Sequence, residues 1–294
     1  MIKALTISGG GANGEAASAQ IARLAKPAEP WSIFTGESIG AAQAYMTALD
    51  GPAAALRFWD AIKPSDIFRG GGWLEKAATG LGLRHGLFDM EPARKTLAKL
   101  AAGRRLPAHI RVVVTVTDMV TGALLPFELN RDTPPALCVE RVWRSCLVPL
   151  AHKIPGGRYA DGGVSFTAPL APAIGAGADH VDVILLDRLG TSEWAPTEDV
   201  LPLAGRAIGI LRENLFWADL QGTWLRNQLS DYRKITASYY EPDHALPPWM
   251  DFEPQAKQRR RLMTFTGRTL DETYWLVKAL RDNALAKSLK ETTV

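Results

Sequence analysis

The sequence predicts an α/β fold: a single domain whose mainly parallel sheet is flanked by helices in three layers. Short β-branched runs alternate with helical stretches in the first part of the chain, at 2–7, 15–25, 31–35 and 39–49. This alternation is typical of parallel strands covered by helices. A chain of 294 residues, 47% of them hydrophobic, has enough apolar material for one large core.

The turns between these early elements are rich in glycine. The strand predicted over 2–7 ends at three consecutive glycines, and the helix 15–25 follows. The strand predicted over 31–35 passes through Gly-Glu-Ser directly into the helix 39–49, whose residues are mostly small. Because ligands of open parallel sheets bind beyond the carboxyl ends of the strands, we expect the functional site near these two turns.

Two further buried strands are predicted downstream. Residues 110–118 are nearly continuous in β-branched residues, as expected for a strand that is buried on both faces. Residues 121–129 are suited to return as its antiparallel hairpin partner. Residues 181–187 predict another buried strand.

The remainder of the chain is predicted to be helical. One long helix is expected over about 203–229, and a C-terminal helix begins at a capping box formed by Thr269 and Glu272. One face of this last helix, at helical spacing, is marked by Leu270, Tyr274, Val277, Leu280, Ala284 and Ser288. The single domain therefore spans 1–294, with core motifs in 5–190 and a helical C-terminal part in 200–294.

Composition excludes several classes of protein. The formal net charge of +3 is too small to indicate nucleic-acid binding. The two cysteines, Cys138 and Cys146, form no Cys/His cluster, so we expect free thiols and no metal. The chain begins with no signal peptide and holds no apolar stretch of about 18 residues. We therefore expect a soluble, cytoplasmic protein, whose oligomeric state stays open.

Three segments allow two interpretations each. The basic run 257–261 is a solvated face or a contact for anionic lipid. Trp217, Trp224 and Trp249 are core residues or part of a lipid-facing patch. The glycine-rich stretch 68–88 is a surface loop or a mobile lid, and it lacks the Gly-Lys-Ser/Thr ending of a phosphate-binding loop.

The pentapeptide Gly36-Glu37-Ser38-Ile39-Gly40 raises the question of a catalytic serine. Its Gly-x-Ser-x-Gly pattern matches a nucleophile elbow, in which a strand, a sharp turn and a helix expose the serine hydroxyl. The predicted strand before it and the helix after it supply that context. A serine in a glycine-bounded turn is the alternative interpretation.

The first glycine loop, residues 8–14, also has two interpretations. Its glycines can direct backbone N–H groups at a developing oxyanion, at a helix N-terminus that favours negative charge. The same loop contains Gly-x-Gly-x-x-Gly, a dinucleotide-binding pattern that requires an acidic residue at the end of the second strand. Glu37 stands at that position.

A third motif, Asp161-Gly162-Gly163, follows more than 100 residues after the serine. A glycine loop, then Gly-x-Ser-x-Gly, then Asp-Gly-Gly in this order resembles the patatin-like phospholipase family. The resemblance implies Ser38 as nucleophile and Asp161 as the only base. The glycines that match the oxyanion loop are Gly9, Gly10, Gly11 and Gly14, and those that support the other two motifs are Gly36, Gly40, Gly162 and Gly163.

Weaker likenesses extend the resemblance over most of the chain. Residues 116–129 look like the hairpin of the family, and the Ser-x-x-x-Pro of 145–149 looks like its segment ahead of the aspartate. Three positions depart from the pattern: Asn13 replaces an arginine, Glu37 replaces a small residue or threonine, and Ile39 replaces a small residue. We expect Glu37 to point away from the site or to be paired, because an unpaired carboxylate opposes an oxyanion.

The resemblance implies a serine-dependent lipid acyl hydrolase of the phospholipase A or lysophospholipase kind, with a Ser-Asp dyad and no cofactor. It implies a lipid or acyl-ester substrate, with peripheral contact at a membrane surface and no nucleic acid. The alternatives are a catalytically silent patatin-like module that binds lipid or protein, and a general esterase or thioesterase.

A Ser-His-Asp triad would require a histidine in the site. We expect structural or surface positions for all five histidines, namely His85, His109, His152, His180 and His244.

Overall fold

The computed structural model describes residues 1–70, 86–149, 151–165, 167–168, 170–189, 200–247, 251 and 253–291. In these residues, eight strands form one sheet in the order β10-β9-β8-β1-β2-β5-β6, and β7 also pairs with β5. The strands are β1 Lys3–Ile7, β2 Ile33–Gly36, β5 Arg111–Asp118, β6 Leu124–Leu129, β7 Tyr159–Asp161, β8 His180–Ile184, β9 Thr236–Pro242 and β10 Phe265–Thr269. A separate ladder joins β3 (Arg69–Gly70) and β4 (Phe88–Asp89).

The sheet is mainly parallel, as predicted. The five strands from β9 through β8, β1 and β2 to β5 pair in parallel. Antiparallel pairing is confined to β10 with β9 at one edge, and to β6 and β7 with β5 at the other.

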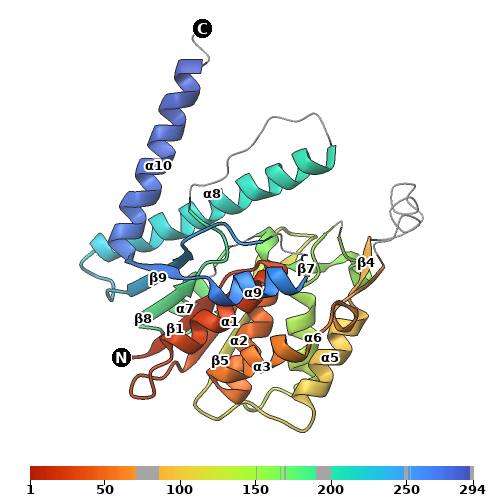
Figure 1. Cartoon of the computed structure of the whole chain (residues 1–294). Helices are drawn as coiled ribbons and strands as arrows, with labels where there is room; N and C mark the ends of the chain where they lie inside the picture. The colour runs from red at the N-terminus through yellow and green to blue at the C-terminus, as the bar shows by residue number, and fades with distance from the viewer. Residues whose placement is uncertain are drawn as a thin grey trace.

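Helices cover both faces of this sheet (Figure 1). Their bounds are α1 Gly14–Leu24, α2 Ile39–Asp50, α3 Pro52–Ala61, α5 Glu91–Ala101, α6 Pro135–Arg144, α7 Leu170–Gly175, α8 Val200–Gln228, α9 Pro254–Leu262 and α10 Leu270–Glu291. Alternate strand residues belong to separate cores: Leu5 and Ile7 pack with α1, α2, α5 and α6, whereas Ala4 packs with α7, α8 and α10. This period of two in side-chain direction produces the three layers.

One edge of β5 is shared by two strands, and this positions the site. β2 pairs with β5 as far as Gly36 opposite Val114. Beyond that point β7 pairs with β5, with Asp161 opposite Val116. Since β6 occupies the other edge of β5 over this region, β7 takes the edge that β2 leaves. Asp161 therefore lies beside the segment that follows Gly36.

The predicted elements of the first 190 residues are confirmed as β1, α1, β2, α2, the β5–β6 hairpin and β8. The capping box is also present, since the Thr269 N–H donates to Glu272 Oε2 at 2.8 Å and the Glu272 N–H donates to Thr269 Oγ1 at 3.3 Å. The apolar face of α10 is buried at Leu270, Tyr274 and Val277, but Ala284 is exposed.

The C-terminal part over 200–294 is predicted to be helical, but it also contains two strands. β9 and β10 lie in this part and extend the central sheet beyond β8. The sequence predicts neither strand clearly. β9 has tyrosines and a proline rather than a β-branched run, and every residue of β10 is exposed or half-buried. The C-terminal part therefore belongs to the same layered structure.

Trp217 and Trp224, the two candidates that the structure describes, are half-buried and pack against the core. Trp224 stacks on Tyr274 with ring centroids 4.1 Å apart, and Trp217 stacks on the same ring at 5.4 Å. Both side chains thus join α8 to α10. Trp249, and most of the glycine-rich stretch 68–88, lie outside the described residues.

Most side chains of the basic run 257–261 form contacts within the chain. Arg261 pairs with Glu15 of α1 and Asp60 of α3. Arg260 is fully buried, and Lys257 donates to the carbonyl groups of Trp59 and Ile62. These three side chains therefore fasten α9 to α1 and α3, whereas Arg259 is exposed. None of the described helices is both long and apolar enough to cross a bilayer.

The contact of α2 with β1 yields a stability prediction. A Cβ on Gly40 would collide with the Ile7 carbonyl, at the point where α2 begins against β1. Gly40→Ala is expected to lower the free energy of unfolding by about 3 kcal/mol, measured by urea denaturation. Gly175→Ala is the control, because nothing lies within 4 Å of a Cβ there. Equal stability of the two variants would contradict this packing.

Candidate active site

Ser38 occupies a strained turn between β2 and α2. Its φ of 55° and ψ of −131° lie in a region that non-glycine residues rarely adopt. The Ser38 N–H donates to both the carbonyl oxygen and the hydroxyl of Ser145, each at 3.0 Å. The Ser145 hydroxyl in turn donates to the Thr115 carbonyl of β5 at 2.7 Å. Ser145 thereby holds the backbone of the turn against β5. A strained serine in a sharp turn between a strand and a helix is the geometry of a nucleophile elbow.

The two glycines of the pentapeptide are required by close backbone packing. A Cβ on Gly36 would lie 2.5 Å from the Gly40 carbonyl carbon. A Cβ on Gly40 would collide with the backbone of β1. The spacing Gly-x-Ser-x-Gly therefore follows from how tightly the chain reverses between β2 and α2.

Asp161 ends β7 and is buried. Its Oδ1 accepts the Gly163 N–H at 2.7 Å, and its Oδ2 is buried without a hydrogen-bond partner among the described residues. Burial raises the pKa of Asp161 to about 6, although the Ser38 side chain, the Gly163 N–H and Arg212 partly offset this rise. Gly162 is needed because a Cβ there would lie 2.5 Å from the Thr115 carbonyl oxygen.

Ser38 and Asp161, which the resemblance implies as nucleophile and base, lie near one another in the structure. The Ser38 hydroxyl is near enough to Asp161 to lower the pKa of that carboxyl. Among the described residues, Asp161 Oδ1 accepts the Gly163 N–H, and Asp161 Oδ2 has no partner within ordinary hydrogen-bond geometry. Such contacts are often long in an enzyme without substrate and shorten in the complex.

Some backbone N–H groups of the glycine loop are hydrogen-bonded within the protein and others are not. The Gly9 N–H donates to Glu37 Oε1 at 2.7 Å, and the Gly14 N–H bonds within the 3-10 turn η1 (Gly11–Asn13). Within the described residues the N–H groups of Gly10 and Gly11 have no such partner. Gly11 has a φ of 57°, which favours glycine. Gly10 and Gly11, and not Gly9 or Gly14, therefore have N–H groups available to a ligand.

Glu37 is paired, as expected, but it lies inside the site. It is fully buried, and its Oε1 also accepts the Ala168 N–H at 3.1 Å. Burial raises the pKa of Glu37 to about 7. Because the carboxyl is held against Gly9, it is not placed to bind a ribose hydroxyl. Glu37 therefore does not supply the acidic residue that dinucleotide binding by this loop would require.

Arg260 is a site neighbour that the sequence motifs did not reveal. Its Nε donates to Asn13 Oδ1 at 2.8 Å from α9, and its side chain is fully buried. The guanidinium therefore contacts the glycine loop at Asn13, the position where the resemblance leads one to expect an arginine. No sequence signal links two residues so far apart in the chain.

No described histidine forms a hydrogen bond with Ser38 or Asp161. His152 is buried and accepts the Val148 N–H at 2.9 Å, and burial lowers its pKa to about 4. His109 and His244 are exposed. His85 lies outside the described residues.

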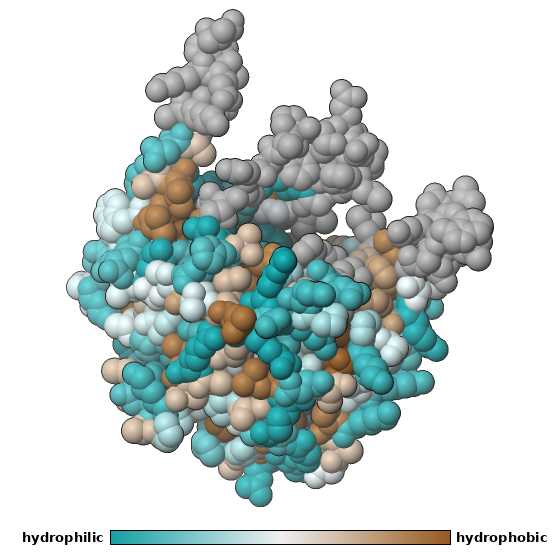
Figure 2. Space-filling view, viewed as in Figure 1, coloured by the Kyte–Doolittle hydropathy of each residue, from teal (hydrophilic) through white to brown (hydrophobic). Residues whose placement is uncertain are grey.

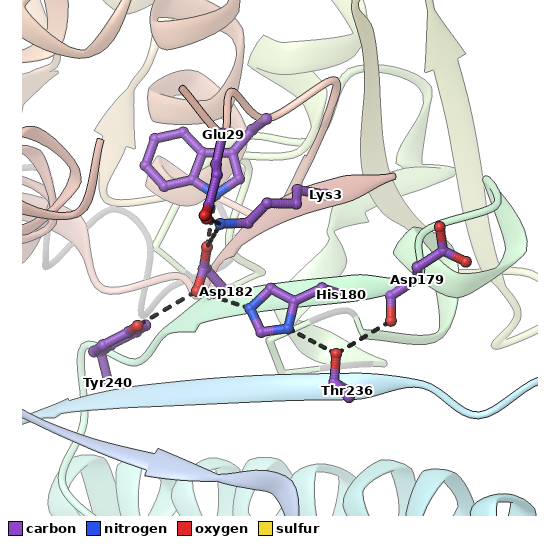
Figure 3. A network of polar contacts seen from close by, with 8 residues as sticks. Lys3, Glu29, Asp179, His180, Asp182, Thr236 and Tyr240 are labelled. Atoms are coloured by element: carbon purple, nitrogen blue, oxygen red, sulfur yellow. Dashed lines mark hydrogen bonds and ion pairs between the residues drawn. The ribbon is translucent and has the colours of Figure 1, made fainter. Parts of the chain in front are cut away.

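His180 belongs to a polar network at the opposite end of the sheet (Figure 3). It lies opposite Lys3 at the amino ends of β8 and β1, whereas Ser38 follows the carboxyl end of β2. Asp182 is the centre of this network: it accepts the Trp31 indole N–H at 2.7 Å and lies 3.3 Å from His180 Nε2. The network joins the strand ends and has no part in the serine site.

Metal-ligand clusters are also absent from the described part of the chain. No group of three or more His, Cys, Asp or Glu side chains there could hold a metal ion.

Comparison with known proteins identifies the family. A family model described as patatin-like phospholipase matches residues 5–174. The chain belongs to the patatin-like phospholipase family. At the level of the family this supports lipid acyl hydrolysis, and hence a lipid substrate. The matched region contains the glycine loop, the elbow and the Asp-Gly-Gly motif.

Other comparisons add less. No curated protein sequence matches the chain significantly. Among solved structures, VipD from Legionella pneumophila is similar at a TM-score of 0.45 and 14% sequence identity, over 96% of this chain and 67% of that one.

Ser145 offers a test of how the elbow is held. Ser145→Ala removes the hydroxyl that bonds both the Ser38 N–H and the Thr115 carbonyl. Labelling of Ser38 by a fluorophosphonate probe is expected to slow about tenfold, the loss that about 1.4 kcal/mol of positioning would produce. Ser18→Ala is the control, because it also removes a buried hydroxyl that donates to a backbone carbonyl. Equal labelling rates for the two variants would mean that Ser145 does not hold the elbow.

Proposed function

We propose that the protein is a serine-dependent lipid acyl hydrolase of the phospholipase A or lysophospholipase kind, with a Ser38–Asp161 dyad. The observation that carries the proposal is the strained elbow of Ser38 beside the buried carboxyl of Asp161, whose Oδ2 has no hydrogen-bond partner among the described residues. Family membership supports the same class of reaction. No described histidine competes with Asp161 for the role of base.

In the proposed reaction, Ser38 Oγ attacks the ester carbonyl and its proton passes to Asp161. The N–H groups of Gly10 and Gly11 stabilise the resulting oxyanion, a contribution of about 3–4 kcal/mol per donor in measured cases. Gly9, named with them from the sequence, positions the loop through Glu37 instead. Asp161 then protonates the leaving alkoxide, and it later activates the water that hydrolyses the acyl-enzyme.

The raised pKa of Asp161 suits this role. A carboxyl with a pKa near 6 is mostly ionised at neutral pH, yet it is a better proton acceptor than an ordinary aspartate. The rise has its main cause in burial, so the same dry environment also strengthens the N–H groups that face the oxyanion.

Exposed apolar side chains support peripheral membrane contact and a lipid substrate. Leu211 and Leu225 of α8 are 59% and 50% exposed, and Trp275 of α10 is 55% exposed. Figure 2 shows hydrophobic residues gathered on α10, where this helix rises from the body of the protein. The protein is proposed to act in the cytoplasm and to reach lipid through this face.

The alternative with a specific observation behind it is a catalytically silent patatin-like module that binds lipid or protein. Glu37 brings a second carboxyl into the site, and an ionised carboxylate there would oppose the oxyanion. A short chromogenic ester distinguishes the two, because only an enzyme releases the chromophore. Profiling a total lipid extract before and after incubation then separates a lipase from a general esterase or thioesterase.

The nucleophile can be tested directly. Ser38→Ala is expected to abolish ester turnover and fluorophosphonate labelling while the thermal midpoint stays close to that of the wild type, since the serine side chain is small and only partly buried. Mass spectrometry should find a single labelled peptide, the one containing Ser38. Labelling of another residue, or activity in the alanine variant, would overturn the assignment.

The base is tested by its titration. Asp161 accepts a proton only when it is ionised, so kcat/KM is expected to fall as the pH drops below about 6. Asp161→Asn keeps the shape of the turn but not the acceptor, and should lower kcat at least a thousandfold, or about 4 kcal/mol of barrier. Histidine-to-glutamine variants at positions 85, 109, 152, 180 and 244 are the controls. Inactivation by one of these in a folded protein would indicate a triad.

A further inference from the structure

Glu37 is the buried ionisable residue that the proposed mechanism does not use. It precedes the nucleophile, has no exposed surface, and turns its carboxyl toward the backbone of two loops. Oε1 accepts the Gly9 N–H at 2.7 Å and the Ala168 N–H at 3.1 Å. One carboxyl oxygen therefore ties the glycine loop after β1 to the loop after β7.

The residues joined by this oxygen are themselves held in unusual conformations or tight contacts. Ala168 has a φ of 53°, which a non-glycine residue adopts only when its surroundings impose it. A Cβ on Gly9 would lie 3.0 Å from Ser38 Cβ, so this loop packs directly against the nucleophile. A shift of either loop would move a group that the reaction needs.

The two carboxyl groups of the site flank the same glycine. A Cβ on Gly163 would lie 3.0 Å from Asp161 Oδ1 and 3.6 Å from Glu37 Cγ. Both Asp161 Oδ2 and Glu37 Oε2 are buried without partners in the described part of the chain. Two ionised carboxyls in such a place repel one another, and each ionised oxygen lacks a donor.

The charged groups that act on Glu37 are few. Asp161 of β7 opposes its ionisation, and Arg212 of α8 favours it. Arg212 is itself bound to Asp187 and to the Thr167 hydroxyl. Burial outweighs the arginine and the two N–H groups, so the pKa of Glu37 rises to about 7, above that of Asp161.

We propose that Glu37 is a positioning residue that holds the glycine loop against the loop after Asp161, and that turnover requires its protonated form. This inference rests on the proposed function. A protonated carboxyl still offers Oε1 to both N–H groups, but it adds no negative charge beside the developing oxyanion. The active enzyme then has one proton on the pair, with Asp161 ionised and Glu37 neutral.

The test compares the pH dependence of Glu37→Gln with that of the wild type. The glutamine carbonyl can accept both N–H bonds and cannot ionise, so it mimics the protonated form at every pH. The ratio of kcat/KM on a short chromogenic ester, Glu37→Gln over wild type, is expected to rise at least fivefold between pH 6 and pH 8.5. Glu37→Ala, which lacks the acceptor, should lower kcat at least tenfold across this range.

Glu15→Gln is the matched control. Glu15 of α1 is also fully buried and also has an unpartnered Oε2, but its Oε1 pairs with Arg261 of α9. Its activity ratio to the wild type should not change with pH. A flat ratio for Glu37→Gln, or wild-type kcat in Glu37→Ala, would overturn the proposal.

Thermal unfolding gives a readout that needs no activity. A carboxyl whose pKa rises from 4.5 to about 7 on folding destabilises the folded state progressively as the pH rises between those values. The melting temperature of Glu37→Gln relative to the wild type should therefore increase from pH 4.5 to pH 7 and then level off. If no variant hydrolyses ester, the proposed function fails. A difference in melting temperature that does not change with pH would show that folding does not raise the pKa of Glu37, which would contradict this proposal.

Discussion

The serine site depends on the edge of β5 that β2 and β7 share. Gly36 ends the pairing of β2 opposite Val114, and Asp161 pairs opposite Val116 on the same edge. Two segments that are more than 100 residues apart in sequence are thereby set in register. Thr115 lies between the two pairs: its carbonyl accepts the Ser145 hydroxyl and contacts Gly162. A single strand thus supports both the elbow and the turn that carries Asp161.

The chemistry of the site follows from the burial of its ionisable groups away from water. The same burial that raises the pKa of Asp161 toward neutrality also raises that of Glu37, and Arg212 is the cation that acts on both. Because like charges destabilise one another in a low dielectric, the pair retains a proton more readily than two separate carboxyls would. The backbone N–H groups of the glycine loop then meet the substrate in an environment where their dipoles act strongly.

Much of this arrangement could be predicted from local sequence. At positions 36, 40 and 162 the backbone lies too close to other backbone atoms for a Cβ, so glycine is required there. The strand, the turn and the helix around Ser38 can each be recognised from a few consecutive residues. Contacts between distant segments could not be predicted in this way. The buried Arg260 reaches Asn13 across most of the chain, and Glu37 accepts the N–H of Ala168. Nothing in the residues around either one indicates its partner. β9 and β10 were not predicted because β9 has no β-branched run and β10 is exposed or half-buried.

The most direct test of this account is a crystal structure of the protein after reaction with a fluorophosphonate. A phosphonyl group is expected on Ser38 Oγ, with its charged oxygen about 3 Å from the N–H groups of Gly10 and Gly11. Asp161 should face the bonded oxygen, and Glu37 should still accept the N–H groups of Gly9 and Ala168. A phosphonyl oxygen directed away from Gly10 and Gly11, or a histidine in contact with Ser38 Oγ, would contradict the proposed dyad and its oxyanion site.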